Sequence, residues 1–249
     1  MLAKKYRSTV TSIINPFTGI YTLEFKSLNG KYKYLPGQFL HIALDEDYDG
    51  SSQWPESRCF SMQSNPNEET IKITYAVKGE FTKQMEQQLR VGSEVWLKLP
   101  YGDLFTQTHN KTNTVFIAGG TGITPFLSLF THESFNEYTN PHIYLGFRSK
   151  DFNIYQAELD RMTTIRAISP ESEAIRDSCN SSREQSDSGF VKSFFQDNDG
   201  IINIQQIFDE NGIDSDYFIS GPPAMIKAFK QALITKGVAA QNVLTDDWE

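Results

Sequence analysis

The chain has 249 residues, of which 39% are hydrophobic and 22% charged, an ordinary globular composition with room for two modest domains. Its two cysteines exclude a disulfide framework and a four-cysteine iron–sulfur cluster within these residues. No apolar run approaches the roughly 20 residues that span a bilayer, and the N-terminal segment lacks the apolar core of a secretory signal. We therefore expect a cytoplasmic protein without a membrane span.

The net charge of −8 is unevenly distributed along the chain. Through Thr108 there are 12 Lys and Arg against 12 Asp and Glu, whereas the remainder holds 11 against 19. The acidic second half argues against nucleic acid as a partner. The ordinary solvated surface of a soluble protein also explains this excess of acidic residues.

The first hundred residues alternate short β-like runs with turn residues, which predicts a barrel or sandwich. A helix interrupts them at Phe81–Leu89, where Phe81, Met85 and Leu89 share one face. The six predicted strands are Tyr6–Ile14, Ile20–Lys26, Gln38–Ala43, Cys59–Gln63, Thr70–Val77 and Glu94–Leu99.

After Thr108 strands alternate with helices, which predicts crossover connections and a mostly parallel sheet. The polar segment 106–113 marks the boundary between two predicted domains, 1–108 and 109–249. The Ser-, Glu- and Asp-rich stretch 169–189 is expected to be a long surface loop. The predicted elements are strands Thr114–Ala118, His142–Gly146 and Asp216–Ser220, and helices Pro125–Phe130, Ile154–Met162 and Pro223–Thr235.

The segment Gly119–Pro125 joins a predicted strand to a predicted helix. Thr124 suits the N-cap, and Pro125 suits the first helical position. The glycines let a ligand approach the backbone, and a helix start offers N–H groups to a phosphate. A pyrophosphate site and a ligand-free turn are both compatible with this segment.

Two segments of the first domain carry similar signals. Arg58 offers a fork that suits phosphate, and Phe60 points to the same side of its strand. Gly79 separates a strand from a helix start near Thr82, which gives a second place for phosphate. A surface arginine, a core phenylalanine and an ordinary turn are the simpler alternatives.

In this order the segments resemble the ferredoxin/flavodoxin–NADP reductase superfamily over nearly the whole chain. That resemblance implies an antiparallel flavin-binding β-barrel followed by an α/β nucleotide-binding domain. Arg58-Cys59-Phe60-Ser61 resembles the flavin motif Arg-x-Tyr-Ser/Thr, with Phe60 replacing the tyrosine. It implies that Arg58 binds flavin phosphate, Phe60 packs on the isoalloxazine and Ser61 faces its N5. The remaining implied FAD contacts are Tyr75, Ala76, Val77, Gly79 and Thr82.

The second domain carries the matching nucleotide motifs. Ser220-Gly221-Pro222-Pro223-Ala224-Met225 resembles Cys-Gly-x-x-x-Met, whose cysteine lies beside the nicotinamide; here it is Ser220. The resemblance implies that Ser182 and Arg183, with Arg148 as a second contact, hold the 2′-phosphate of NADP. A solvent-exposed loop arginine is the alternative. The other implied nucleotide contacts are Gly120, Thr121, Gly122, Thr124, Pro125, Gly221, Pro222 and Met225.

The chain end carries Trp248, which resembles the family's terminal aromatic that covers the second face of the flavin; a frayed terminus is the alternative. Asp246, Asp247 or Glu249 is a candidate proton relay. The expected catalytic residues are thus Ser61, Ser220 and Trp248. The four histidines show no metal-ligand spacing, so no metal is expected.

We predict an FAD-dependent oxidoreductase that takes hydride from NADPH and passes electrons to a separate carrier, ferredoxin or flavodoxin. A flavin reductase or an oxygenase reductase component using NAD(P)H is the alternative within enzymes. The replacements at Phe60 and Ser220 leave open a non-catalytic module that binds a nucleotide or a partner. We expect a monomer.

Overall fold

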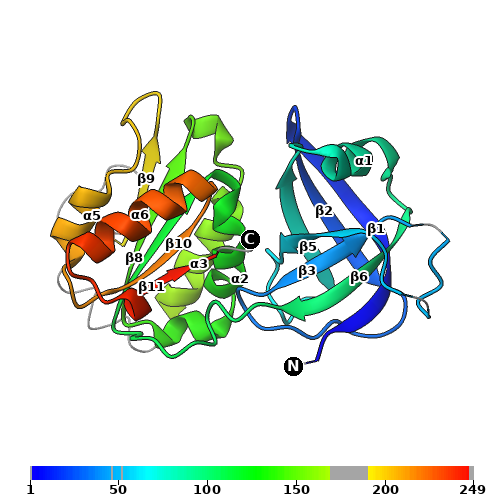
Figure 1. The fold of residues 1–249 in the computed structure, drawn as a ribbon, viewed down its shortest axis with the longest axis horizontal. Helices are drawn as coiled ribbons and strands as arrows, with labels where there is room; N and C mark the ends of the chain where they lie inside the picture. Colours follow the sequence, from blue (N-terminus) through cyan, green and yellow to red (C-terminus); the bar gives the residue numbers. More distant parts are fainter. Residues whose placement is uncertain (1, 46, 52, 169–189, 247–249) are drawn as a thin grey trace. The chain divides into compact units, whose positions relative to one another are not determined.

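The computed structural model describes residues 2–45, 47–51, 53–168 and 190–246. By its contacts the chain forms two units, which are described separately (Figure 1). Unit 1 contains residues up to 107 together with 124–132, and unit 2 contains 108–123 and the described residues from 133 onward. The domains 1–108 and 109–249 stay our proposal for the chain.

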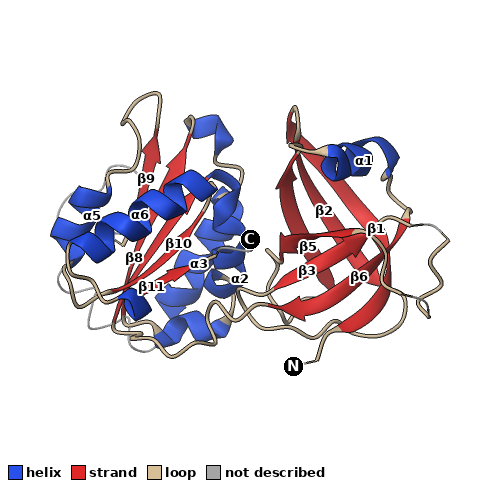
Figure 2. Ribbon diagram, in the orientation of Figure 1, coloured by secondary structure: helices blue, strands red, loops and turns tan. Residues whose placement is uncertain are grey.

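Unit 1 is built on a six-stranded antiparallel sheet of order β4-β3-β6-β1-β2-β5 (Figure 2). The edge strands β4 and β5 also contact each other, which curls the sheet into a barrel. All six strands expected from the sequence are present. They are β1 (Lys4–Phe17), β2 (Ile20–Ser27), β3 (Phe39–Ala43), β4 (Ser57–Ser61), β5 (Thr70–Ala76) and β6 (Glu94–Tyr101).

The barrel core follows from strand alternation. Leu23 pairs with Ile73 and Phe25 with Ile71 across β2 and β5, and all four side chains are buried. Helix α1 (Glu80–Gln88) adds Phe81 and Met85 to the same core, as their spacing predicts.

Unit 2 is built on a five-stranded parallel sheet of order β11-β10-β7-β8-β9 (Figure 1). Its strands are β7 (Asn113–Gly119), β8 (Asn140–Phe147), β9 (Val191–Phe195), β10 (Asp216–Ser220) and β11 (Val243–Thr245). Its helices are α3 (Gln156–Ile168), α5 (Ile204–Asn211) and α6 (Pro223–Thr235). Strand β10 is buried at every residue, as expected of a strand covered on both faces.

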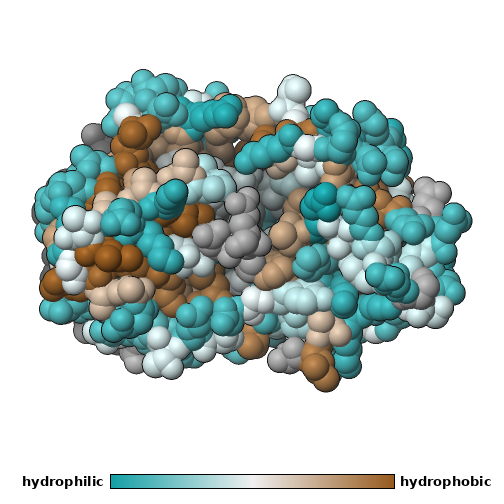
Figure 3. Space-filling view, viewed as in Figure 1, coloured by the Kyte–Doolittle hydropathy of each residue, from teal (hydrophilic) through white to brown (hydrophobic). Residues whose placement is uncertain are grey.

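Helices α5 and α6 pack against each other across one face of this sheet. Figure 3 shows hydrophobic residues among hydrophilic ones over this face. The exposed apolar side chains of unit 2 include Ile201, Ile213 and Ile234. No helix in the described ranges is both long and apolar enough to cross a bilayer.

Helix α2 (Thr124–Phe130) packs with the barrel although its sequence neighbours belong to unit 2. Two polar contacts hold it there. The Gly37 N–H donates to Ser128 Oγ (2.8 Å), and Asn65 Nδ2 donates to the Thr131 carbonyl (2.5 Å). Since every residue of α2 is buried, this short helix is stabilised by packing rather than by propensity.

One local expectation was wrong. Thr124 is not the N-cap, because a 3-10 turn over Gly120–Ile123 leads directly into α2. Thr124 is the first residue of α2 and Pro125 the second, and the helical backbone begins at Gly120, five residues before the predicted start at Pro125.

Candidate functional site

Arg58, on edge strand β4, lies against the start of helix α1. Its guanidinium centre is 5.4 Å from the centroid of the Phe81 ring. Nη2 is 3.0 Å from Glu56 Oε1, and Nη1 donates to the Ser57 carbonyl at 2.9 Å. The side chain is 54% exposed. The cation is therefore oriented by its neighbours and still accessible to an anion.

The amino end of α1 supplies N–H donors beside this cation. Thr82 Oγ1 accepts from the N–H groups of Lys78 (2.9 Å) and Gly79 (3.1 Å) and donates to the Gly79 carbonyl. The first intrahelical bond is donated by Lys83 to Gly79. The N–H groups of Glu80, Phe81 and Thr82 precede that bond and point out of the helix start.

The Thr82 hydroxyl is thus committed to the turn, so what Thr82 offers to a phosphate is its backbone N–H. A Cβ built on Gly79 would meet no atom within 4 Å, which leaves open space beside the backbone. The arginine, the helix start and the open backbone together fit a pyrophosphate.

Phe60 and Tyr75 lie together on the barrel. Their rings meet edge to face, with centroids 5.8 Å apart. Tyr75 stacks on Tyr21 at 5.6 Å, and the Tyr21 hydroxyl donates to Glu86 at 2.8 Å. Burial raises the pKa of Tyr75, so its phenol stays neutral. Phe60 is only partly buried, so part of its ring is available to a planar ligand.

The other predicted flavin contacts lie on neighbouring strand ends. Ser61 pairs with Phe39 of β3 and is partly buried. Ala76 ends β5, and the Val77 N–H donates to the Gly19 carbonyl at 2.8 Å. The backbone of Val77 is therefore held in place where the resemblance puts a flavin contact.

In unit 2 the two glycine-containing motifs pack on each other. A Cβ on Gly122 would lie 2.5 Å from Gly221 N and 2.6 Å from the Ser220 carbonyl carbon. A Cβ on Gly119 would lie 2.9 Å from the Met225 sulfur and 3.1 Å from Pro222 Cδ. Glycine at 119 and 122 is therefore required for packing between the motifs.

Gly120 is different, because a Cβ there would meet nothing within 4 Å. Its φ of +56° lies in the left-handed region that glycine adopts readily. Of the loop glycines, Gly120 is the one with open space beside it. Thr121 is partly buried next to it, whereas Thr124 and Pro125 are buried.

Both motifs lie at the carboxyl edge of the parallel sheet, as the sequence predicts. Ser220 pairs with Ala118, the residue before the glycine loop. Ser220 Oγ donates to Asp246 Oδ2 at 2.9 Å, and Asp246 follows β11 directly. Sequence reasoning named both residues but not this contact.

Arg148 follows β8 at the same edge and is exposed, with its guanidinium centre 5.9 Å from the Phe152 ring. Its predicted companions Ser182 and Arg183, and the terminal Trp248, lie outside the described residues. Within the described ranges no group of three His, Cys, Asp or Glu residues can hold a metal ion.

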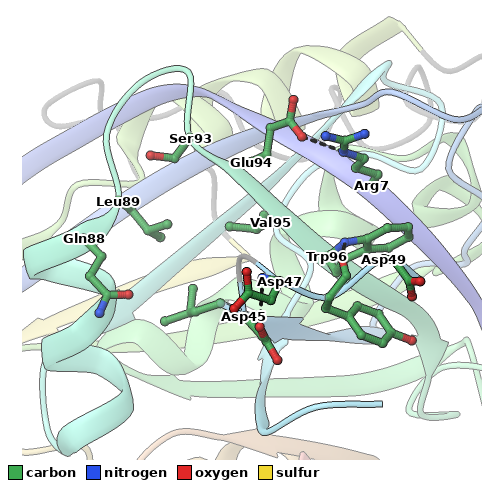
Figure 4. A pocket seen from close by; sticks show the side chains of 12 residues that line it. Arg7, Asp45, Asp47, Asp49, Gln88, Leu89, Ser93, Glu94, Val95 and Trp96 are labelled. Atoms are coloured by element: carbon green, nitrogen blue, oxygen red, sulfur yellow. Dashed lines mark hydrogen bonds and ion pairs between the residues drawn. The ribbon is translucent and has the colours of Figure 1, made fainter. Parts of the chain in front are cut away.

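The barrel also carries a cavity of about 500 Å³ that contains none of the predicted site residues (Figure 4). Leu44, Val95 and Trp96 line it, and Arg7 forms an ion pair with Glu94 at its edge. Two of the carboxylates that line the cavity form hydrogen bonds to the backbone of their own loop. Asp45 accepts from the Asp47 N–H, and Asp49 accepts from the Ser51 N–H.

The comparisons with known proteins agree with this geometry. The family model described as an oxidoreductase NAD-binding domain matches residues 116–231. A ferredoxin NADP+ reductase from Neisseria gonorrhoeae with bound FAD and NADP has a TM-score of 0.68 at 17% identity, covering 94% of this chain and 92% of that one. Residues 116–231 thus match an oxidoreductase NAD-binding domain, and the two-domain fold is similar to that of this reductase.

Two curated relatives of this chain are longer proteins. Flavohemoprotein A of Dictyostelium discoideum is 23% identical, covering 91% of this chain and 56% of its own length. The propane 2-monooxygenase reductase component of Mycolicibacterium smegmatis is 29% identical, covering 61% of this chain and 43% of its own length. The chain therefore spans about half the length of these relatives.

The two-domain fold is the one expected from the sequence. The Neisseria gonorrhoeae reductase of this fold has FAD and NADP bound. The residues present fit both groups. In the flavin motif, the open backbone at Gly79 accompanies the Arg58 cation and the start of α1. In the nucleotide motif, the open backbone at Gly120 is part of a glycine turn.

Proposed function

We propose that this chain takes hydride from NADPH onto a bound FAD and passes the electrons to a separate carrier protein. The observation that supports it most is the Arg58 guanidinium held over Phe81 at the start of α1. A cation and unpaired helix N–H groups at one place suit the pyrophosphate of FAD better than any neutral ligand.

The chain's own residues have separate tasks. Arg58 and the α1 N–H groups hold phosphate, and Phe60 offers its exposed ring face to the flavin. FAD, when bound, supplies the ability to accept a hydride and release electrons singly. The glycine motifs of unit 2 bind the nicotinamide nucleotide, with Gly120 as the point of closest backbone approach.

NADP rather than NAD is the proposed nucleotide. Arg148 lies exposed at the carboxyl edge of β8, where a guanidinium suits a 2′-phosphate dianion. An NAD site would favour an acid on the ribose hydroxyls. Ser182 and Arg183 are proposed as further contacts with the same phosphate.

The proposed electron acceptor lies outside these residues, because their two cysteines cannot hold a four-cysteine cluster. Ferredoxin or flavodoxin is the acceptor expected from the sequence. The relative named as the reductase component of a propane 2-monooxygenase supports an oxygenase partner at least as strongly. A cytoplasmic monomer is the proposed form.

Anaerobic titration of the purified protein with NADPH and then NADH tests the first step. We expect a yellow protein whose flavin absorbance bleaches with NADPH at lower concentration than with NADH. A colourless protein that FAD cannot reconstitute would instead be the non-catalytic module.

Stopped-flow mixing of the reduced enzyme with ferredoxin, flavodoxin, free flavin and an oxygenase component tests the second step. One protein carrier is expected to be reduced much faster than the rest. Equal and slow rates with every protein carrier would contradict electron transfer to a protein partner.

A further inference from the structure

The cavity on the barrel has an apolar wall to which three elements contribute (Figure 4). Val95 and Trp96 belong to β6, Leu44 follows β3 directly, and Leu89 follows α1. Val95 and Leu89 are buried, with exposed fractions of 3% and 7%. The volume of about 500 Å³ is that of a small-molecule site, so the space suits an organic ligand with an apolar body.

The loop that follows β3 is fixed to the barrel beside this wall. Trp96 Nε1 donates to the Tyr48 carbonyl at 2.8 Å, and Lys5 Nζ donates to the Gly50 carbonyl at 3.0 Å. A Cβ on Gly50 would lie 2.6 Å from the Trp96 ring, and Gly50 has a φ of +89°, so this close approach requires glycine. A ligand therefore meets a loop that is already ordered, which lowers the entropic cost of binding.

Acidic side chains outnumber basic ones in the described part of the lining. Its charged residues are Asp45, Asp47, Asp49, Glu94 and Arg7. Arg7 forms an ion pair with Glu94, which balances one negative charge and leaves those of the aspartates. The backbone orients two of them, because Asp45 accepts from the Asp47 N–H at 3.0 Å and Asp49 from the Ser51 N–H at 2.8 Å.

Two further cations lie near the cavity but have partners of their own. Lys5 Nζ lies 5.2 Å from the centroid of the Tyr48 ring, besides its bond to Gly50. Arg90 Nη1 donates to the Leu89 carbonyl at 2.7 Å. Neither residue lines the cavity, so negative charge exceeds positive charge among its described lining residues. A cationic ligand is therefore favoured over a neutral or anionic one.

The negative charge of the cavity is spread out rather than gathered at one point. In the part of the chain that the structure describes, no three of these acids form a group that can hold a metal ion. A chain with several ammonium groups can reach separate carboxylates, and each ammonium offers N–H donors for charge-assisted hydrogen bonds. Methylene segments between the ammonium groups match the apolar wall.

We propose that this cavity binds a linear polyamine, a short methylene chain that carries several ammonium groups. The aspartates accept hydrogen bonds from the ammonium groups, while Leu44, Val95 and Trp96 contact the methylene groups. The Trp96 ring adds attraction for an ammonium beside it. The cavity contains none of the residues assigned to FAD or to the nicotinamide nucleotide, so this inference does not rest on the proposed function.

Isothermal titration calorimetry of the purified chain with spermidine, a trication at pH 7, tests the inference at constant ionic strength. We expect one spermidine to bind per chain, about tenfold more tightly than Ca²⁺ or Mg²⁺. The uncharged 1,8-octanediol, a chain of the same length, should not bind. Protein with and without FAD should bind spermidine equally, because the cavity lies outside the predicted flavin site.

Asp47→Asn removes one carboxylate charge from an exposed loop position and should weaken spermidine binding about tenfold. Asp45→Asn, whose amide oxygen can still accept from the Asp47 N–H, should give a similar loss. The matched control is Glu69→Gln, which removes an exposed carboxylate outside the cavity and should leave the affinity within about twofold.

Three results would overturn the inference. The first is the absence of saturable spermidine binding. The second is an equal loss of affinity in Asp47→Asn and Glu69→Gln, which would mean general attraction to an acidic surface. The third is tighter binding of Ca²⁺ than of spermidine, which would make the loop a metal site instead.

Discussion

Arg58 is the residue whose removal should most directly affect flavin binding. Its guanidinium lies 5.4 Å from the Phe81 ring at the α1 start and remains half exposed. A charge-assisted phosphate contact contributes about 2 kcal/mol, so Arg58→Ala should weaken FAD binding about 30-fold. Fluorescence titration of the apoprotein with FAD measures this. Arg7→Ala removes an exposed arginine elsewhere on the barrel and should leave FAD affinity unchanged.

Gly122 and Gly120 should respond differently to the same substitution. A Cβ at Gly122 would enter the backbone of Gly221, whereas at Gly120 it would find open space and only the strain of φ +56°. We expect Gly122→Ala to cost about 3 kcal/mol of stability and Gly120→Ala about 1 kcal/mol. Denaturant unfolding followed by circular dichroism compares them. If Gly120→Ala were the more destabilising change, the packing argument would be wrong.

Single residues could be predicted from sequence where a motif fixes their neighbours. The resemblance assigned both Arg58 and the Gly79 segment to the phosphates of the flavin, and the structure has the Arg58 guanidinium against Phe81 at the start of α1. The Ser220–Asp246 hydrogen bond could not be predicted, since the two residues are 26 positions apart and meet only through the register of β10 and β11. The motif marks Ser220 but carries no information about its partner.

At the level of elements, Glu210 of α5 ties three segments of unit 2 together. Its Oε2 accepts from Tyr144 of β8 at 2.7 Å and lies 2.8 Å from Lys192 Nζ of β9. These hydrogen bonds, first from Lys192 and then from Tyr144, lower the pKa of Glu210 from 4.5 to about 2.

A depressed carboxyl pKa in the folded state contributes stability above the unfolded pKa, and that contribution is lost as pH falls toward the folded value. Glu210→Gln should therefore lower Tm at pH 7 by a small amount, because Glu210 is exposed and screened. The difference from wild type should shrink between pH 4.5 and about 2. Thermal unfolding across this range checks it, with the exposed Glu133→Gln as control; a constant difference would contradict the assignment.

The elements that sequence reasoning found are those with a strong period of their own. Ile71, Ile73 and Tyr75 alternate with polar residues, and β5 occurs where expected. Strand β11 has three residues and exists through its pairing with β10, so no local pattern reveals it. Strand β9 was also missed. Helix α5 was missed despite a usable signal, since Asn203 accepts from the N–H groups of Gln205 and Gln206 as an N-cap.

For the whole molecule, the sequence predicted the change from alternating strands to strand–helix units, and with it the two-domain fold. It did not predict that α2 packs with the barrel. Composition favours neither unit for that segment, because Thr124–Phe130 is apolar enough to be buried in either core. The chain thus passes from unit 2 to unit 1 and back between residues 123 and 133.

Because the two cofactors are assigned to different units, their removal should affect different parts of the thermal unfolding profile. A ligand that binds only the folded state stabilises it by RT ln(1 + [L]/Kd), about 2.7 kcal/mol when its concentration is 100 times Kd. In differential scanning calorimetry, removing FAD should lower the transition of unit 1, and adding NADP+ should raise that of unit 2. Arg58→Ala provides the matched control, because it should abolish most of the FAD response and leave the NADP+ response intact. If FAD and NADP+ shifted a single transition equally, the two units would unfold as one cooperative structure, and separate responses would be ruled out.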